Sequence, residues 1–287
     1  MRANLMMLLA AFIWGTAFVA QAVGMEEIGP FTYGMGRYLL GTVFLILFWL
    51  WYRKRQKGRH RSGFGVGLIV GLAMFVASAL QQVSLLYTTA GKTAFLTCLY
   101  IVFVPMIAVF LKHRIRPENW LGAVLGIVGL YFLCVKEDLV FNFGDILAFL
   151  CSIGWAVHIL LIDHYVEKHD AIEISVAQCF MCLVLNTAVA FTVETVALTP
   201  ILNMFWPIFY AGIMSSGVAF TLQILAQKEA EPAHIALIMS LEAVFGAVSG
   251  WVILGEIMTT SEIIGCVLVL VATLTTQSRL IFGKLLR

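Results

Sequence analysis

Residues 233–253 read AHIALIMSLEAVFGAVSGWVI, an unbroken apolar run that contains a single acidic residue. A helix needs about 20 apolar residues to cross a bilayer, whereas the strands of a membrane barrel alternate in polarity. Lipid also requires every backbone polar group to bond within the protein, and a continuous helix meets that requirement. The run therefore predicts a transmembrane helix with Glu242 near its middle.

Comparable runs recur along the whole chain, joined by short loops. Of its 287 residues, 61% are hydrophobic and 12% are charged, which is too few polar residues to cover a soluble protein. The composition excludes an ordinary soluble enzyme, a nucleic-acid-binding module and a disulfide scaffold. We predict an all-α integral membrane protein with ten transmembrane helices, at 5–24, 31–52, 63–85, 93–111, 119–135, 143–162, 172–193, 203–225, 233–253 and 260–281.

The basic residues indicate which way the chain is inserted. Fifteen of the 18 Lys and Arg residues fall in the loops that share a side with the termini, and Lys136 alone falls in the other loops. The positive-inside rule then places both termini of a multi-pass membrane protein in the cytoplasm. We interpret the run RKRQKGRHR at 53–61 as a topology anchor. Ala20, Gln21 and Ala22 also fit a signal-peptide cleavage site, which stays an alternative for the first helix.

The two halves of the chain resemble each other. Residues 88–129 align without a gap on residues 231–272. An offset of 141 residues pairs Trp14 with Trp155 and Arg37 with Gln178. We predict two five-helix repeats, at 1–138 and 139–287. Because five is odd, the second repeat enters the membrane inverted, as in many secondary transporters, whose binding sites lie at the repeat interface.

Three ionisable side chains lie in or against the predicted helices. A charge at the bilayer centre costs roughly 2.5–3.5 kcal/mol on insertion scales, so such residues need partners, water or a function. Glu242 is a candidate for proton coupling or amine binding, or else a structural hydrogen-bonding group. Arg37 is a carboxylate clamp or an interhelical lock onto carbonyls or an acid. Lys92 either snorkels to the interface or attracts an anionic group.

Further candidates surround these charges. Trp14 and Trp155 occupy comparable depths in the two repeats and could wall an aromatic cavity, although many membrane aromatics only pack. His158 is either a packed core histidine or a proton relay. The remaining candidate binding residues are Gln82, Tyr100 and Gln223.

No enzyme motif is present: the chain contains no P-loop, no Gly-x-Gly-x-x-Gly after a strand and no His-Glu-x-x-His. We therefore predict a protein that is not an enzyme and uses no cofactor and no metal. Cys179 and Cys182 are interpreted as small packing residues, because a soft-metal pair would need a nearby His or acid.

Four stretches carry a family resemblance. They are AAFIWGTAFV at 10–19, PFTYGMGRYLLG at 30–41, LQQVSLLYTTAGKTAFLTCLYIVFVP at 80–105, and residues 233–265, which hold a Leu-Glu pair, then Leu-Gly-Glu and a later Gly. Together they resemble the drug/metabolite transporter superfamily, and within it the EamA-type exporters. Ala243 stands where that family often has proline, and Lys112 with His113 stands where its first repeat often has Gly-Glu.

The resemblance implies a ten-helix inner-membrane carrier that exports metabolites such as amino acids. We expect a secondary transporter that works by alternating access on a small polar molecule in the lipid bilayer. Coupling to protons is left open, and no nucleic-acid partner is expected. An importer or exchanger is the main alternative, and a channel is a weaker one because no ring of like charges is evident. A membrane enzyme would need clustered catalytic groups, and a scaffold would need no embedded charges.

Overall fold

A computed structural model describes residues 2–54, 61–88, 90–112, 115–134, 142–254 and 257–285 of the chain. Its regular elements over those ranges are helices, in the order α1 Arg2–Gly24, α2 Pro30–Arg53, α3 Phe64–Ser84, α4 Ala90–Cys98, α5 Tyr100–Phe110, α6 Pro117–Cys134, α7 Phe143–Val166, α8 Ala171–Val193, α9 Leu198–Asn203, α10 Phe205–Tyr210, the π-helix η1 Ala211–Ala219, α11 Phe220–Gln227, α12 Pro232–Met239, α13 Leu241–Leu254 and α14 Thr260–Leu285. The predicted all-helical class is thus confirmed.

Nine segments among the described residues are long and apolar enough to cross a membrane, and they match the first nine predicted spans to within a few residues. The tenth predicted span, 260–281, falls in α14, whose apolar part over Thr260–Thr275 is shorter. The count of ten therefore stays a prediction. The predicted repeat boundary at 138 and 139 lies outside the described residues.

Local chemistry explains where several helices begin. Pro30, Pro117 and Pro232 occupy first helical positions, where the missing N–H costs nothing. Asn142 and Asp145 form a reciprocal capping box at the start of α7. These polar caps satisfy N–H groups that the first turn of a helix otherwise leaves unpaired.

Three of the candidate spans are not single α-helices. α4 and α5 share the span Lys92–Phe110 and meet at Leu99, and α12 and α13 share Pro232–Ile253 and meet at Ser240. The third span, Phe205–Gln227, is made of α10, η1 and α11. The hydroxyl of Ser240 bonds the carbonyl of Leu237, and the N–H of Ala243 bonds back only three residues to Ser240. This local bonding interrupts the helix although no proline stands at position 243.

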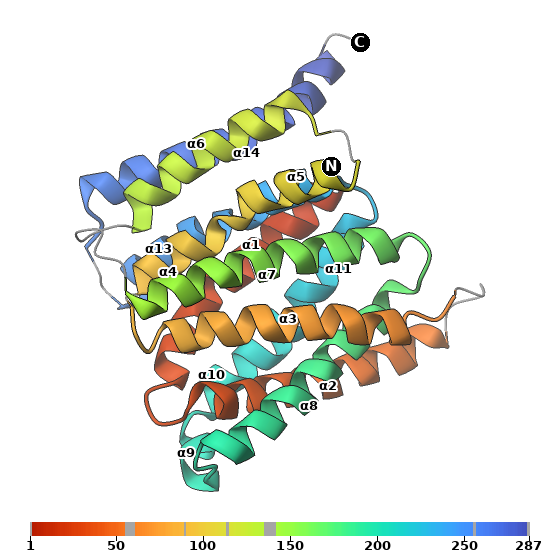
Figure 1. Cartoon of the computed structure of the whole chain (residues 1–287), viewed down its shortest axis with the longest axis vertical. Helices are drawn as coiled ribbons and strands as arrows, with labels where there is room; N and C mark the ends of the chain where they lie inside the picture. Colours follow the sequence, from red (N-terminus) through yellow and green to blue (C-terminus); the bar gives the residue numbers. More distant parts are fainter. Residues whose placement is uncertain are drawn as a thin grey trace.

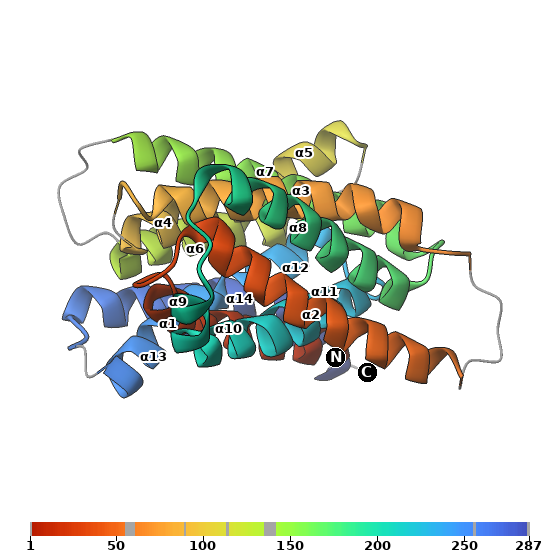
Figure 2. The ribbon, with the colours of Figure 1, turned by 90° about the horizontal axis from the view of Figure 1, so that it is seen from below.

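The most extensive helix contacts join the first half of the chain to the second. α2 packs on α8, α3 on α7 and α8, α1 on α13, and α6 on α14. In Figure 1, α6 and α14 lie together at one edge of the molecule, and α2 and α8 lie together at the other. Figure 2 shows an upper layer with α3, α4, α5 and α7 above a lower layer with α1, α10 and α13.

Glycine permits the closest of these contacts. A Cβ added at Gly71 would lie 2.7 Å from Cβ of Met181 and 2.8 Å from backbone atoms of Gln178. One at Gly15 would lie 2.7 Å from the carbonyl oxygen of Glu242. The backbones of α3 and α8, and of α1 and α13, therefore approach as closely as small residues allow in membrane helix pairs.

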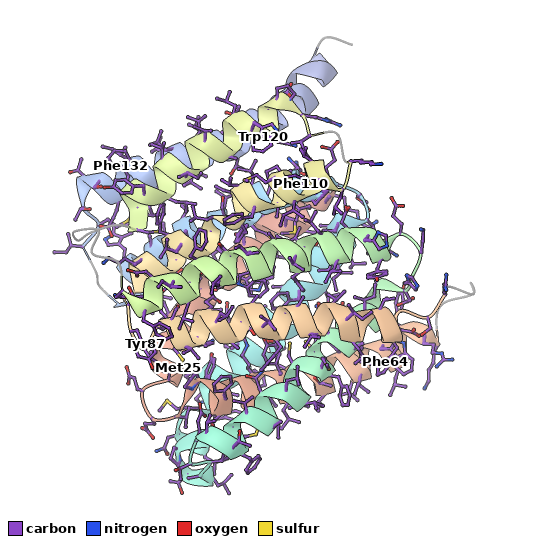
Figure 3. All side chains as sticks on the ribbon, in the orientation of Figure 1. Met25, Phe64, Tyr87, Phe110, Trp120 and Phe132 are labelled. Atoms are coloured by element: carbon purple, nitrogen blue, oxygen red, sulfur yellow. The ribbon has the colours of Figure 1, made fainter. Side chains whose placement is uncertain are left out.

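Large apolar side chains point outward around the helices, as Figure 3 shows for Phe110, Trp120 and Phe132. Phe110 is 84% exposed, and many other large hydrophobic residues share this outer surface. In water such a surface would be a severe liability, whereas acyl chains solvate it. The polar side chains of Arg37, Gln178 and Glu242, which lie within the spans, are accordingly buried.

Candidate functional site

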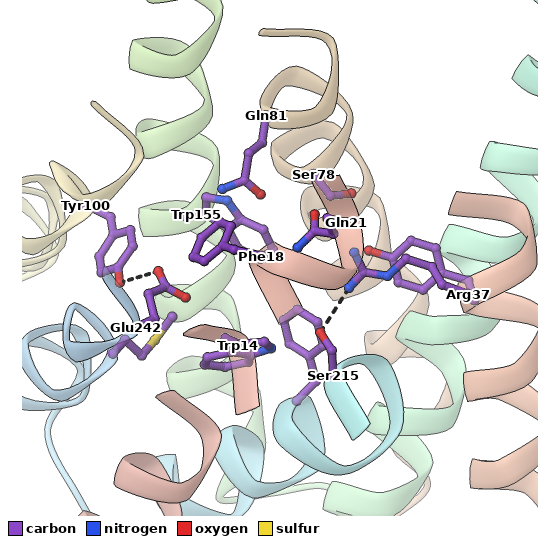
Figure 4. A pocket seen from close by; sticks show the side chains of 13 residues that line it. Trp14, Phe18, Gln21, Arg37, Ser78, Gln81, Tyr100, Trp155, Ser215 and Glu242 are labelled. Carbon is purple, nitrogen blue, oxygen red and sulfur yellow. Dashed lines mark hydrogen bonds between the residues drawn. The ribbon is translucent and has the colours of Figure 1, made fainter. Parts of the chain in front are cut away.

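A chamber lies between the two layers, and its empty space, part of which is open to solvent, amounts to about 510 Å³. Figure 4 shows its lining residues. They are contributed by α1, α2, α3, α5, α7, η1, α11, α12 and α13, and comprise Trp14, Phe18, Gln21, Arg37, Tyr38, Ser78, Gln81, Tyr100, Trp155, Ser215, Phe220, Met239 and Glu242. Both halves of the chain therefore build one cavity.

Arg37 forms one polar side of the chamber and is only 6% exposed. Its Nε donates to the hydroxyl of Ser216 at 3.0 Å, and its Nη2 donates to that of Ser215 at 3.2 Å. The guanidinium carbon also lies 4.9 Å from the ring centre of Tyr38. These described partners are neutral, so the fold orients the guanidinium without cancelling its charge.

Glu242 forms the opposite polar side and is 8% exposed. The hydroxyl of Tyr100 donates to its Oε1 at 3.0 Å, and the thiol of Cys98 lies 3.9 Å from the same atom. Because the helix breaks at Ser240, Glu242 falls in the first turn of α13, where the helix dipole favours a negative charge. The carboxyl group thus faces the chamber rather than lipid.

An aromatic wall lines the chamber between the two polar sides. Phe220 packs on both predicted tryptophans, with ring centres 5.0 Å from Trp14 and 6.0 Å from Trp155. The rings of Trp155 and Phe220 are inclined by only 15°. Figure 4 shows Trp14 and Trp155 between Glu242 and Arg37. The wall offers apolar contact to a ligand that spans the two polar sides.

A second, smaller cavity of about 240 Å³ shares Arg37, Tyr38 and Ser78 with the chamber. It extends to Pro30 at the start of α2 and includes Gln82, whose amide nitrogen donates to Gln21 at 2.7 Å. Polar space therefore continues from the chamber towards the end of the molecule where α2 begins. We call this second cavity the vestibule.

The fold brings most of the predicted site residues together but not all of them. Trp14, Arg37, Tyr100, Trp155 and Glu242 line the chamber, and Gln82 lines the vestibule. Three predicted residues lie outside both linings. Lys92 is partly buried near the start of α4, and His158 and Gln223 are fully buried behind the aromatic wall.

Eight lining residues are not among the predicted site residues: Phe18, Gln21, Tyr38, Ser78, Gln81, Ser215, Phe220 and Met239. Two consecutive serines both contact Arg37, although successive residues of an α-helix point about 100° apart. Residues 211–219 instead form a π-helix, whose wider turn accompanies the approach of both Ser215 and Ser216 to Arg37. π-Segments are frequent at functional sites, yet nothing in this run of small residues signals one.

Comparison with known families gives one clear match. The model of the EamA-like transporter family matches residues 1–135 and again residues 142–277. The match covers nearly the whole chain and occurs once in each half.

Individual relatives agree with that match. An "Uncharacterized transporter" of Archaeoglobus fulgidus is 30% identical over 281 residues, covering 96% of this chain and 86% of the relative. The threonine/homoserine exporter RhtA of Salmonella typhimurium is 26% identical over 245 residues, covering 83% of this chain and 78% of the exporter. A solved crystal structure at 18% identity superposes with a TM-score of 0.82 over 99% of this chain and 98% of its own, which shows a common fold.

Proposed function

This chain belongs to the EamA-like transporter family and is a membrane transporter, and from that premise we propose that it is a secondary carrier that exports zwitterionic amino acids. The name of the relative RhtA, a threonine/homoserine exporter, supports this substrate class, at 26% identity. The finer assignment rests on the chamber described above.

The observation that carries the proposal is the placement of one cationic and one acidic side chain across a single chamber. In Figure 4, Arg37 and Glu242 face it from opposite sides. A guanidinium binds a carboxylate in a planar, bidentate manner. A buried carboxylate that keeps one hydrogen bond from Tyr100 retains acceptor capacity for an ammonium group. The chamber therefore offers a complementary partner to a carboxylate and another to an ammonium group.

The aromatic wall and the hydroxyls complete the assigned roles. Trp14 and Trp155 would contact the apolar part of the substrate, and Tyr100 would orient Glu242. Ser215 and Ser216 would hold the guanidinium of Arg37 in place. Gln82 would line the route between the chamber and the end where α2 begins.

Coupling to protons follows from the same arrangement. A buried carboxyl group can be stabilised either by binding a proton or by pairing with a cation. Glu242 can therefore hold either a proton or the substrate's ammonium, and exchange of one for the other links their movements. A proton crossing 100 mV releases about 2.3 kcal/mol, enough for roughly fiftyfold accumulation.

The two halves supply a route for alternating access. We assign repeats to 1–138 and 139–287, and the two separate family matches support that division. The extensive contacts between α1, α2 and α3 of the first half and α13, α8 and α7 of the second place the chamber at their interface. An inner-membrane location with both termini in the cytoplasm is part of the proposal, and reporter fusions at the C-terminus test it.

The decisive experiment compares three matched ligands on purified protein: an amino acid, the amine that lacks its carboxylate, and the acid that lacks its ammonium. We expect the amino acid to bind at least tenfold more tightly than either. Arg37→Gln should abolish discrimination against the amine only, and Glu242→Gln discrimination against the acid only. Equal binding of all three ligands by the wild type would refute the substrate class, and counterflow in oriented proteoliposomes separates export from import or exchange.

A further inference from the structure

Three uncharged polar side chains are fully buried just outside the chamber: His158 on α7, Gln178 on α8 and Gln223 on α11. His158 Nε2 lies 3.1 Å from Gln178 Oε1. Within the described part of the chain, His158 Nδ1, Gln178 Nε2 and both amide atoms of Gln223 have no hydrogen-bond partner. Each such atom costs about 1–3 kcal/mol, so four of them on three neighbouring helices require an explanation.

Gln223 belongs to this group by its place on α11. Phe220, three residues before it, packs against the ring of His158. Gln227, four residues after it, donates to the carbonyl of Ile159 at 2.8 Å. Residues three and four apart share a helix face, so Gln223 lies on the face of α11 that packs on α7. We call His158, Gln178 and Gln223 the His158 cluster.

The unpaired atoms of the His158 cluster form a balanced set. Gln178 Oε1 can only accept, so a neutral imidazole donates from Nε2 and keeps Nδ1 as an acceptor. Two amide nitrogens then remain as donors, and His158 Nδ1 with Gln223 Oε1 remain as acceptors. A carboxylate could accept hydrogen bonds from the two amide nitrogens, and an ammonium group could donate to the two acceptors. Because the cluster carries no charge, it would bind a zwitterion weakly and release it readily.

An aromatic pair separates the His158 cluster from the chamber. Trp155 and Phe220 both line the chamber, and the edge of His158 meets both rings, with centroid distances of 5.4 Å and 6.0 Å. Along α7, His158 lies closer than Trp155 to the helix end at Val166. The cluster is therefore on the side of the loops that carry Lys168 and Lys228, which we call the basic end.

The internal duplication gives the His158 cluster a counterpart. The offset of 141 residues that pairs Trp14 with Trp155 also pairs Arg37 with Gln178 and Gln82 with Gln223. Arg37 and Gln82 line the vestibule, on the other side of the chamber. Arg37 and Gln82 thus line a cavity in the first repeat, whereas their counterparts Gln178 and Gln223 line neither the chamber nor the vestibule.

We propose that His158, Gln178 and Gln223 form a second polar site for the carboxylate and ammonium groups of an amino acid, closed in this structure behind Trp155 and Phe220 and opened when the carrier opens at its basic end. This rests on the proposed function, since it requires alternating access and an amino-acid substrate. In an exporter the site is the place where substrate is loaded before it passes the aromatic pair.

The first test replaces Gln223 by methionine, which keeps the side-chain length and removes the unpaired amide. We expect transport of substrate supplied at the basic end to fall at least tenfold, while binding to the chamber of the purified protein changes less than twofold. Gln227→Met, one turn further along α11, is the control for loss of a buried amide: it also breaks the hydrogen bond to the carbonyl of Ile159, so it should lower thermal stability but keep transport within twofold of wild type. Wild-type transport by Gln223→Met overturns the proposal, and so does a parallel loss of binding, transport and thermal stability, which indicates only a structural role.

The second test does not depend on the substrate. Hydroxyl-radical footprinting of the wild type in nanodiscs should modify His158 faster than Met74, a more oxidisable side chain that is equally buried, because only the cluster opens to water. Protection of His158 equal to that of Met74 would show that the site never opens. If the wild type carries no amino acid but His158 is modified, the proposed function fails while the opening of the cluster stands.

Discussion

Arg37 and Glu242 share an unusual property at the scale of single residues: each is almost fully buried, and each has neutral described partners. Removing a charge from water costs several kcal/mol unless an opposite charge compensates. Serine hydroxyls and a tyrosine hydroxyl orient these groups but do not neutralise them. A zwitterionic ligand compensates both at once, which is the physical basis for assigning them to substrate binding.

Glu242→Gln tests the coupling role of the carboxyl group. The amide keeps the size of the side chain and its bond with Tyr100 but cannot exchange a proton, so we expect accumulation driven by a pH gradient to fall at least tenfold. Flux in proteoliposomes with and without the gradient measures this. Glu26→Gln, which removes an exposed loop carboxylate, should leave the flux unchanged. Gradient-driven accumulation that survives Glu242→Gln would exclude this carboxyl group from coupling.

Arg37→Lys tests the guanidinium geometry. A lysine keeps the charge but cannot donate to Ser215 and Ser216 while presenting a planar pair of donors to a carboxylate. We expect the dissociation constant for the amino acid to rise about tenfold, equivalent to roughly 1.4 kcal/mol. The affinity for the matched amine, measured by calorimetry, should not change. If the affinities for the amino acid and for the amine fall by the same factor, Arg37 is a structural lock.

At the scale of helices, interruptions position the site. The break at Ser240 puts Glu242 in the first turn of α13, and the π-helix Ala211–Ala219 accompanies the contact of two consecutive serines with Arg37. The irregular backbone lies next to the cavity, where membrane proteins tolerate it.

Gly71→Ala tests the close packing of α3 on α8. The new methyl group would lie 2.7 Å from Cβ of Met181, so we expect a loss of stability of about 1–3 kcal/mol from overpacking. Gly65→Ala on the same helix is the matched control, because a Cβ there meets nothing within 4 Å. That control should be neutral or slightly stabilising. Thermal unfolding of the two variants in detergent measures the difference, and equal melting would contradict the packing argument.

Glu194→Gln tests a contact that ties the end of α8 to the start of α2. The carboxylate accepts from the N–H groups of Phe31 and Thr32 at 2.9 Å and 2.7 Å and from the hydroxyl of Thr32 at 2.6 Å. An amide must turn its NH₂ towards one of these donors, so we expect a loss of about 1.5–3 kcal/mol. Thermal unfolding is the measurement, with Glu26→Gln as the control. An unchanged melting temperature would mean that water replaces the contact at no cost.

At the scale of the whole molecule, polar contacts join the two halves at both ends. Arg116 pairs with Glu231 at 2.9 Å near the starts of α6 and α12, and Asn203 donates to Glu27 at 2.8 Å at the opposite end. Exposed pairs of this kind contribute little stability, which suits contacts that must open during transport. Alternating access requires each end to open once in every cycle.

Paired cysteines test that requirement. Joining positions 116 and 231, or positions 27 and 203, with a short bifunctional maleimide should stop transport in either case, because each link holds one end shut. The six native cysteines are buried, so they should react little. Single-cysteine variants treated in the same way are the controls and should stay active. Transport that continues through either completed link would exclude alternating access and favour a channel.

Much of the fold and part of the site can be predicted from the sequence alone. Spans, embedded charges and repeat-related tryptophans depend on local hydrophobicity and spacing, so the ranges of nine spans and five of the chamber residues could be predicted. Phe220, Tyr38 and Ser215 could not, because the face that a helix turns to a cavity depends on its rotation against partners more than a hundred residues away. The same packing buries His158 and Gln223 behind the aromatic wall and makes residues 211–219 a π-helix. The hydrophobic composition determines that the chain forms helices in lipid, whereas contacts between the two halves determine which side chains lie together in the chamber.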